Sequence, residues 1–142
     1  MQLDYAILAD AAISKGDGLM HLIGGGISNF NVPAIPAPIS ASLAINFWAN
    51  RADLQREHRL EIRYIDEDGN PMPEIKTLDL PIPPDPNVIQ PKGTHINLML
   101  TISLNQIQVT RAGHFAIDVI MDGRSVKQIP FNINLVIPAA PR

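Results

Sequence analysis

The stretch INLMLTISL, residues 96–104, decides the fold, because a branched apolar residue occupies every second position along it. In an extended strand successive side chains point to opposite faces, so one face of this stretch is wholly apolar. That face consists of Ile96, Leu98, Leu100, Ile102 and Leu104. An amphipathic helix needs apolar residues every three or four positions, which this order does not supply. We therefore predict a central strand of a β-sheet here.

The same alternation recurs in three other segments and extends the strand prediction along the chain. They are residues 43–47, 60–64 and 115–121. The last segment runs into Asp122-Gly123, a pair typical of the type I′ turn whose twist suits a β-hairpin. We expect the return strand to run from Ser125 and to resume as far as Ile137 after a break or bulge at Pro130, because proline cannot donate to the ladder.

The N-terminal region is compatible with two structures, because its apolar residues between Leu3 and Ala12 would also line one side of a helix. The residues that follow favour a strand. Lys15-Gly16-Asp17-Gly18 is a turn cluster, and residues 19–23 form a short apolar run typical of a strand buried on both faces. We therefore expect an N-terminal hairpin.

Two proline-rich segments, residues 33–38 and 81–91, are expected to be long connections, and neither suits a central strand. We expect both to run extended, in polyproline-type geometry, across an end or an edge of the sheets. Asp66 to Asn70 is a polar turn that joins the strand at 60–64 to a shorter strand near residues 75–80.

These elements predict one all-β domain over residues 1–142, an antiparallel two-sheet sandwich of eight or so strands without an internal repeat. An immunoglobulin-like Greek key is the specific topology that we expect. The approach Gly113-His114-Phe115 to the last hairpin resembles the entry to the penultimate strand of such domains, where a tyrosine often stands. Phe115 stands at that tyrosine position and has no hydroxyl for the tyrosine-corner hydrogen bond.

Composition argues against several functional classes. The chain has no cysteine, which excludes disulfides, thiolate metal sites and cysteine nucleophiles. The formal net charge of -3 comes from scattered acids and bases without a basic stripe, so nucleic acid is not an expected partner. Residues 18–50 carry no Asp, Glu, Lys or Arg, but prolines and glycines interrupt them, so we expect no membrane span. Asp4, where a secretory signal would be basic, favours a cytoplasmic location.

Six short motifs distributed over the chain carry a family resemblance. They are Asp4–Ala12, Gly16–Leu19, Leu22–Ile27, Gly113-His114-Phe115, Asp122-Gly123 and Pro130-Phe131. With these motifs the chain resembles a family of small bacterial proteins known as a domain of unknown function. The resemblance implies a bacterial or phage β-sandwich, and it implies no activity, cofactor or catalytic residue.

Two loops invite a ligand-binding interpretation, and in each a structural role is favoured. Gly24-Gly25-Gly26 lacks the Gly-Lys-Ser/Thr of a phosphate loop, so we predict a bulge or a close backbone approach in an edge strand. The acidic turn Asp66 to Asn70 could offer oxygen ligands to calcium. It lacks the EF-hand spacing, and a solvated turn with a positive φ at its glycine is the simpler interpretation.

Four histidines could in principle gather around zinc, but none pairs with another at ligand spacing. They are His21, His58, His95 and His114. We expect His21, which lies within an apolar run, to be a core or interface residue.

Other candidate motifs also favour structural roles. The charged residues between Glu57 and Arg63 suit the water-facing side of an alternating strand. Pro81 to Pro84 matches the loose spacing read by proline-binding modules, but a rigid connector explains it. Gly26-Ile27-Ser28 lacks the closing glycine of a nucleophile elbow. The sequence therefore predicts no catalytic, cofactor-binding or metal-binding residue.

The leading functional hypothesis is a non-enzymatic structural or protein-interaction module that binds through a sheet face or an edge strand and forms a homo-oligomer. Residues 19–23 and 135–137 are apolar on both faces, which is more apolar surface than a two-layer sandwich needs to bury. Exposed apolar area of this kind is typical of a partner surface.

Two other classes remain open. A small-ligand or carbohydrate-binding module is the alternative, for which Trp48, Tyr5 and Tyr64 would supply aromatic platforms beside four phenylalanines. An enzyme of unknown type is the least favoured class, because fold alone does not indicate a reaction.

Overall fold

The computed structural model describes residues 1–15, 18–85, 87 and 94–137. These residues form nine strands and one short helix. In chain order the elements are β1 (Gln2–Ser14), β2 (Met20–Gly25), β3 (Asn29–Val32), β4 (Ala37–Ala49), α1 (Arg51–Leu54), β5 (His58–Asp66), β6 (Leu78–Ile82), β7 (Ile96–Val109), β8 (Gly113–Met121) and β9 (Arg124–Leu135). Within the described ranges there is no helix with the length and apolar character needed to cross a membrane.

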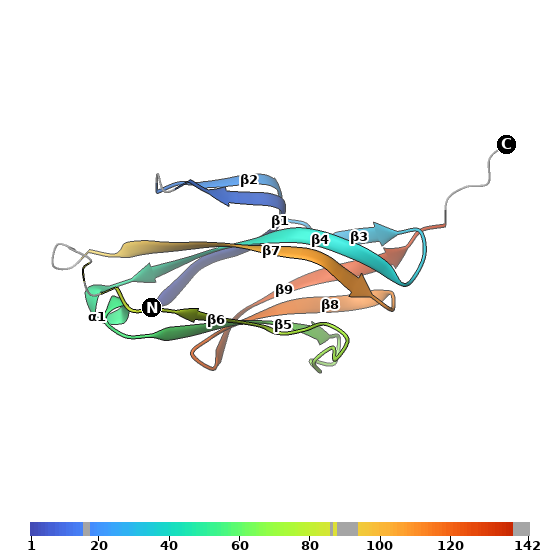
Figure 1. Ribbon diagram of the computed structural model, residues 1–142. Coiled ribbons are helices and arrows are strands. Elements are labelled where there is room, and N and C mark those ends of the chain that lie inside the picture. Colours follow the sequence, from blue (N-terminus) through green and yellow to red (C-terminus); the bar gives the residue numbers. More distant parts are fainter. Residues whose placement is uncertain (16–17, 86, 88–93, 138–142) are drawn as a thin grey trace.

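The strands form two sheets that pack face to face (Figure 1). The four-stranded sheet has the order β2-β1-β4-β7, and the five-stranded sheet, which is curled, has the order β3-β9-β8-β5-β6. Every neighbouring pair is antiparallel except β3 and β9, which run parallel. The predicted all-β architecture of two sheets is confirmed, with one parallel pair that the sequence did not predict.

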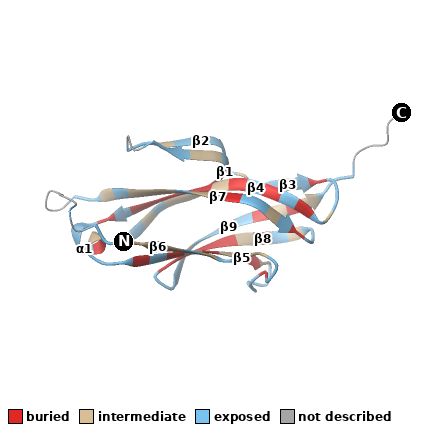
Figure 2. Ribbon diagram, in the orientation of Figure 1, coloured by how far each residue is buried: buried red, intermediate tan, exposed pale blue. Residues whose placement is uncertain are grey.

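The core lies between the facing sheets, where Figure 2 shows the buried residues on the inner strands. Leu43, Ile45 and Phe47 of β4 alternate into this layer and are 0% exposed. Leu60 and Ile62 enter it from β5 on the opposite sheet. Burying a side chain of this size contributes about 1.5–3 kcal/mol relative to leaving it exposed. The three alternating segments at 43–47, 60–64 and 115–121 are thus confirmed as strands.

The stretch 96–104 lies in β7, as predicted, but the prediction of a central strand is wrong. Among the described strands β7 pairs only with β4, so it forms an edge of the four-stranded sheet. Alternation indicates that one face of a strand is apolar and says nothing of how many strands lie beside it. Of the apolar residues in β7 only Leu104 and Val109 are buried, and the others remain partly exposed.

The last two strands form the predicted hairpin. Asp122 and Gly123 have φ values of 51° and 79°, as a type I′ turn requires, and they join β8 to β9. The expected break at Pro130 is wrong, because β9 runs without interruption through this residue. The amide of Asn132 donates to the Ser28 carbonyl, so the nitrogen of Pro130, two residues earlier, faces the same side. The strand β3 begins its pairing only at Asn132, and the missing N–H of Pro130 therefore costs no ladder bond.

The N-terminal hairpin is also confirmed, since β1 pairs with β2 in antiparallel register. The expectation that residues 19–23 are buried on both faces is wrong. Leu19 and Ile23 are 58% and 66% exposed, and only Met20 of the six residues in β2 is partly buried. In this segment, therefore, apolar residues on both faces do not mean that both faces are buried.

The two proline-rich segments are shorter as connections than predicted. Pro38 lies inside β4, at a point where β4 pairs with β7 but where β1, which reaches only to Ser42, is not yet beside it. Pro81 lies inside the edge strand β6, which pairs with β5 alone. Both sites suit proline, because each leaves one side of the strand without a hydrogen-bond partner. Residues 86 and 88–93 of the second segment lie outside the described residues.

Candidate interaction surface

The free side of β7 is a long edge that carries neither charge nor proline. Its fourteen residues, Ile96–Val109, include no Asp, Glu, Lys, Arg or Pro. Edge strands in monomeric proteins are commonly short, charged or interrupted by proline, because unpaired N–H and C=O groups form a template for another strand. The edge of β7 is therefore open to strand addition along most of its length.

The edges of the five-stranded sheet differ in this respect. The strand β6 has five residues, among which Asp79 is an exposed acid paired with Arg59 at 3.3 Å and Pro81 removes one donor. At the other edge β3 has four residues, and the part of β9 that β3 does not cover includes Lys127 and Pro130. Length, charge and proline therefore protect these two edges.

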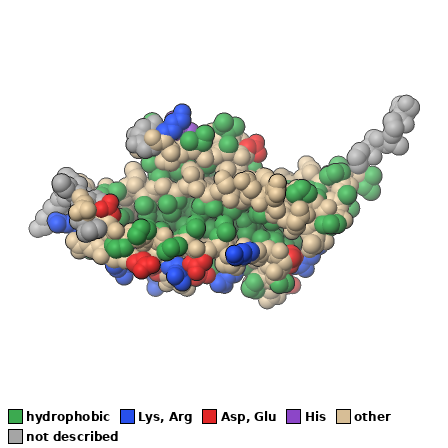
Figure 3. Space-filling view, in the orientation of Figure 1, with side chains coloured by type: hydrophobic (Ala, Val, Ile, Leu, Met, Phe, Trp, Pro, Cys, Tyr) green, Lys and Arg blue, Asp and Glu red, His purple; other side chains and the backbone are tan. Residues whose placement is uncertain are grey.

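An apolar band lies between β7 and β6 and is only partly covered. It consists of Leu98, Leu100 and Ile102 of β7 together with Leu78, Leu80 and Ile82 of β6. Figure 3 shows hydrophobic side chains gathered along this side of the sandwich, which we call the open side. A strand added to the free edge of β7 would extend the four-stranded sheet over the open side and cover part of this band.

A β-bulge interrupts β7 at one end of the open side. Between the pairs Ile39–Ile107 and Ala41–Leu104, two residues of β7 lie opposite Ser40 alone. One of them, Gln106, has a φ of 53°, and its amide donates to Ser40 Oγ at 3.1 Å. A positive φ is uncommon for a residue with a Cβ, and bulges often lie beside functional sites.

A solvent-open cavity of about 310 Å³ adjoins this bulge. Leu78, Leu104 and Ile107 supply apolar walls, and Glu74 and Lys76 lie at its rim on the segment that precedes β6. The phenol of Tyr64 also lines the cavity, and burial raises the pKa of this group. The lining therefore combines apolar side chains with a polar phenol, as small-ligand sites commonly do.

The β1–β2 hairpin is the second unusual feature of the four-stranded sheet. After Ala9 the strand β1 leaves β4 and pairs only with β2, so the hairpin stands off from the rest of the sheet (Figure 1). It exposes four large apolar side chains, at 48%, 58%, 37% and 66% of their surface respectively: Ile13, Leu19, Leu22 and Ile23. Exposed apolar residues gathered on one element are typical of an interaction site.

The triple glycine forms the bulge that we predicted at the base of this hairpin. The amides of Gly26 and Ile27 both donate to the Leu8 carbonyl, at 2.8 and 3.0 Å. Gly24 has a φ of 62°, and a Cβ at this position would lie 2.3 Å from Asp10 Oδ2. The positive φ and the close Asp10 side chain therefore explain the glycine at position 24 without a phosphate.

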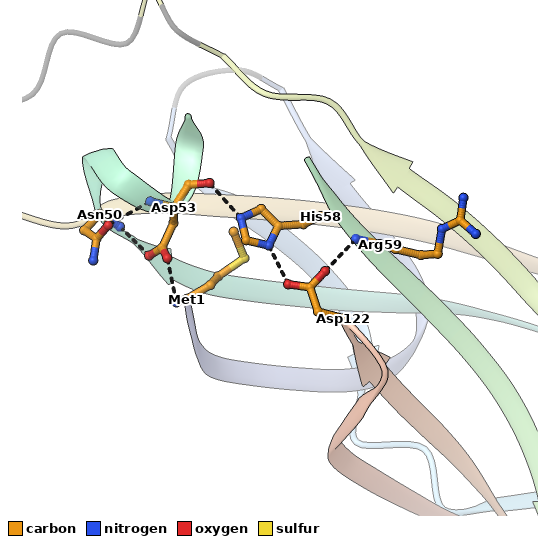
Figure 4. Close-up of polar contacts among 6 residues, drawn as sticks. All are labelled: Met1, Asn50, Asp53, His58, Arg59 and Asp122. Carbon is orange, nitrogen blue, oxygen red and sulfur yellow. Dashed lines mark hydrogen bonds and ion pairs between the residues drawn. The ribbon is translucent and has the colours of Figure 1, made fainter. Parts of the chain in front are cut away.

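A buried polar cluster, which sequence reasoning missed, joins the helix to the β8–β9 turn (Figure 4). His58 is 2% exposed, and its Nδ1 lies 2.6 Å from Asp122 Oδ2. Its Nε2 donates to the Asp53 carbonyl at 2.7 Å, since a carbonyl can only accept. Both ring nitrogens are thus engaged by protein atoms, so His58 fastens the turn to the helix and offers no nitrogen to a substrate.

The two carboxylates of this His58 cluster are held in the charged form. Burial disfavours the charge of Asp122, but the hydrogen bonds from His58 and from the Arg59 amide outweigh it and lower the pKa of the carboxyl. Burial also opposes the charge of Asp53. The hydrogen bond from the Asn50 amide, the Met1 ammonium at 3.1 Å and nearby His58 together lower its pKa.

The remaining histidines do not approach one another. His21 lies in β2 and His114 in β8, where its Nδ1 is 2.5 Å from Asn132 Oδ1. His95 stacks on Trp48 with ring centroids 5.4 Å apart, which covers one face of an indole that is 38% exposed. Over the described ranges no three His, Asp or Glu side chains come together as a metal site.

The acidic turn and the charged face of β5 form internal contacts. Asp66 Oδ1 accepts from the amides of Asp68 and Asn70, and Gly69 has the predicted positive φ, at 81°. Arg63 pairs with Glu61 at 3.3 Å on the exposed side of β5. These contacts fit the solvated turn and water-facing strand that we predicted.

The comparison with protein families assigns this chain to a family. No curated protein matches this chain. One family model, described as a family of unknown function, DUF6941, matches residues 4–134. The match covers nearly all of the strands described above and agrees with the resemblance seen in the sequence. The chain therefore belongs to the family of unknown function DUF6941.

Proposed function

We propose that this protein is a non-enzymatic interaction module that binds a protein partner through the free edge of β7. The observation that carries the proposal is the fourteen-residue edge without a charge or a proline, next to a partly covered apolar band. An edge of this kind invites aggregation unless a partner covers it. We infer that a protein partner covers the edge of β7 in the cell.

Strand addition accounts for both features of this edge. Main-chain hydrogen bonds to β7 would supply affinity, and alternate side chains of the added strand would lie on the open side and supply specificity. Apolar burial contributes about 25 cal/mol for each Å² removed from water, so covering Leu98, Leu100 and Ile102 adds to the hydrogen bonds.

We also propose that the topology is an immunoglobulin-like Greek key. Strand order supports it, because β4 and β7 neighbour each other in one sheet while β5, β8 and β9 are consecutive in the other. In immunoglobulin domains strands B and E are likewise neighbours in one sheet, and strands C, F and G lie together in the other. On this assignment β7 lies at a sheet edge because no strand D is present among the described residues.

Site-specific photo-crosslinking in the native host would test the interaction proposal. A benzoylphenylalanine in place of Thr101, which is exposed on β7, should crosslink to a protein. The control is Gln128, an exposed position on β9 of the other sheet. Crosslinking at Thr101 and not at Gln128 would support the proposal, and equal labelling at both positions or at neither would refute it.

The cavity beside Tyr64 favours a second candidate, a small-ligand-binding module. Its apolar walls and the Tyr64 side chain suit a compact ligand with one polar atom. The carbohydrate version lacks an open platform, because His95 covers one face of Trp48. Native mass spectrometry of protein purified from its own host should show a small-molecule adduct that the Tyr64→Phe variant binds more weakly. Purely apoprotein spectra would count against this candidate.

A further inference from the structure

The four-stranded sheet has a second edge that resembles the first. The strand β2 pairs with β1 on one side, and no described strand lies on its other side. Like β7, its six residues include no Asp, Glu, Lys, Arg or Pro. We propose that the partner of β7 is β2 of a second copy of this chain, so that copies join head to tail through one continuous sheet. This inference rests on the interaction function proposed above.

The side chains of β2 suit both surfaces that they would meet. Ile23 pairs with Ala11, which shares a sheet face with Ala9 and Ile7 on the outer side of the four-stranded sheet. Leu22 and Met20 therefore point to the inner side. In a sheet continued past β7, Leu22 would lie toward the apolar band, and Ile23 would lie beside outward residues of β7 such as Thr101.

Pairing of β2 with β7 covers more apolar surface than either symmetric alternative. Two copies joined through β2 alone would leave the open side beside β7 uncovered. Two copies joined through β7 alone would leave the exposed apolar residues of the hairpin, Leu22 and Ile23 among them, in water. Head-to-tail pairing covers both, and neither strand carries a charge that would repel the other.

The geometry also explains why the hairpin departs from its own sheet. The strand β1 stops pairing with β4 at Ala9. Beyond it, residues 11–14 pair only with β2 and project the edge of β2 away from the subunit. A projecting edge can reach the next copy without a clash between the two sandwiches. A contact between two different surfaces forms a ring when its rotation closes and a filament when it does not.

Introduced cysteines test this arrangement directly, because the chain has none of its own. Ile23→Cys protein would be mixed with Thr101→Cys protein, one of the two carrying a tag that separates them by size, and oxidised. Asn97→Cys and Ser103→Cys, on the same face of β7, would cover other registers. A disulfide forms efficiently only where the two Cα atoms are held within about 7 Å of each other, so we expect about tenfold more mixed dimer than with the control Gln128→Cys.

Each other outcome overturns the inference in a recognisable way. Homodimers of Ile23→Cys or of Thr101→Cys as the main product would mean that like edges pair. A protein that is monomeric by light scattering at all concentrations, but whose Thr101 crosslinks to a different protein, would refute self-association and leave the proposed function standing. A monomer without any such crosslink would refute both.

A charge in β2 provides an independent test that needs no oxidation. Ile23 is 66% exposed, so Ile23→Lys should fold normally and weaken self-association by about tenfold or more. Leu135→Lys is the matched control, because Leu135 is an apolar residue 49% exposed that lies on β9 of the other sheet. Equal association of the two variants would overturn the inference.

Discussion

The two sheets of this molecule end in edges of opposite character. The edges of the five-stranded sheet are four and five residues long, and β6 adds Asp79 and Pro81. The edges of the four-stranded sheet, β2 and β7, carry neither charge nor proline, and β7 is fourteen residues long. One chain therefore protects one pair of edges and leaves the other pair open. This contrast is what we expect if the four-stranded sheet is the one that continues into a partner.

The largest predicted effect on the free energy of unfolding concerns a cross-strand pair between β4, inside the four-stranded sheet, and β7 at its edge. Ile45 of β4 lies opposite Leu100 of β7, and Ile45 is 0% exposed whereas Leu100 is partly exposed. Ile45→Ala should lower the free energy of unfolding by about 2–5 kcal/mol. Leu100→Ala should cost about half as much in dilute solution, because less apolar area leaves the core. Urea unfolding at low concentration measures both, and equal costs would mean that β7 is already covered.

A second prediction concerns the cluster that fastens the five-stranded sheet at its β8–β9 turn. His58→Ala should lower the free energy of unfolding by about 2–3 kcal/mol, because Asp122 and the buried Asp53 carbonyl lose a hydrogen-bond partner. Urea unfolding again provides the measurement. His114→Ala is the control, since His114 is exposed and also bonds one side chain, and its removal should cost no more than about 0.5 kcal/mol. Equal losses would show that the cluster is not the stabilising feature.

The third prediction removes the protection of β6. Asp79→Thr combined with Pro81→Val should change the free energy of unfolding by no more than about 1 kcal/mol, because both residues are exposed. It should also make the protein associate through β6, which light scattering would detect as added mass above that of the parent. A variant with unchanged mass would mean that charge and proline do not distinguish the two kinds of edge.

Alternation along the chain predicted most of the strands, because a period of two reports directly which side chains face the core. It could not place β7 at an edge, since the number of neighbouring strands depends on pairings with residues far away in sequence. The missing charges over residues 96–109 were a usable signal for an open edge. The same limit applies to β2, whose apolar residues are mostly exposed and not buried on both faces.

Sequence reasoning could not assemble the His58 cluster. His58 and Asp122 are 64 positions apart, and only the pairing of β5 with β8 brings them together. Local signals identified the Asp-Gly turn, but they gave no indication that its carboxylate also binds a histidine. Pro130 shows the converse, because a strong local rule against proline in a strand failed where the neighbouring strand was too short to need the lost donor.

The smallest predicted effect is the pH dependence of the stability that Asp122 contributes at the β8–β9 turn. The pKa of Asp122 is lowered in the folded state, so its contribution is present above the unfolded pKa, which is about 3.9 for aspartate, and is lost as the pH falls through the lower folded value. Stability measured by urea unfolding should therefore fall more between pH 5 and pH 3 in the parent than in Asp122→Asn, by under about 1 kcal/mol because the carboxylate is partly exposed. Asn-Gly also favours the type I′ turn, so this variant removes the charge and keeps the backbone preference. The same fall in both proteins would assign the acid sensitivity to Asp53 or to other carboxylates, and the turn would then be held by its backbone geometry alone.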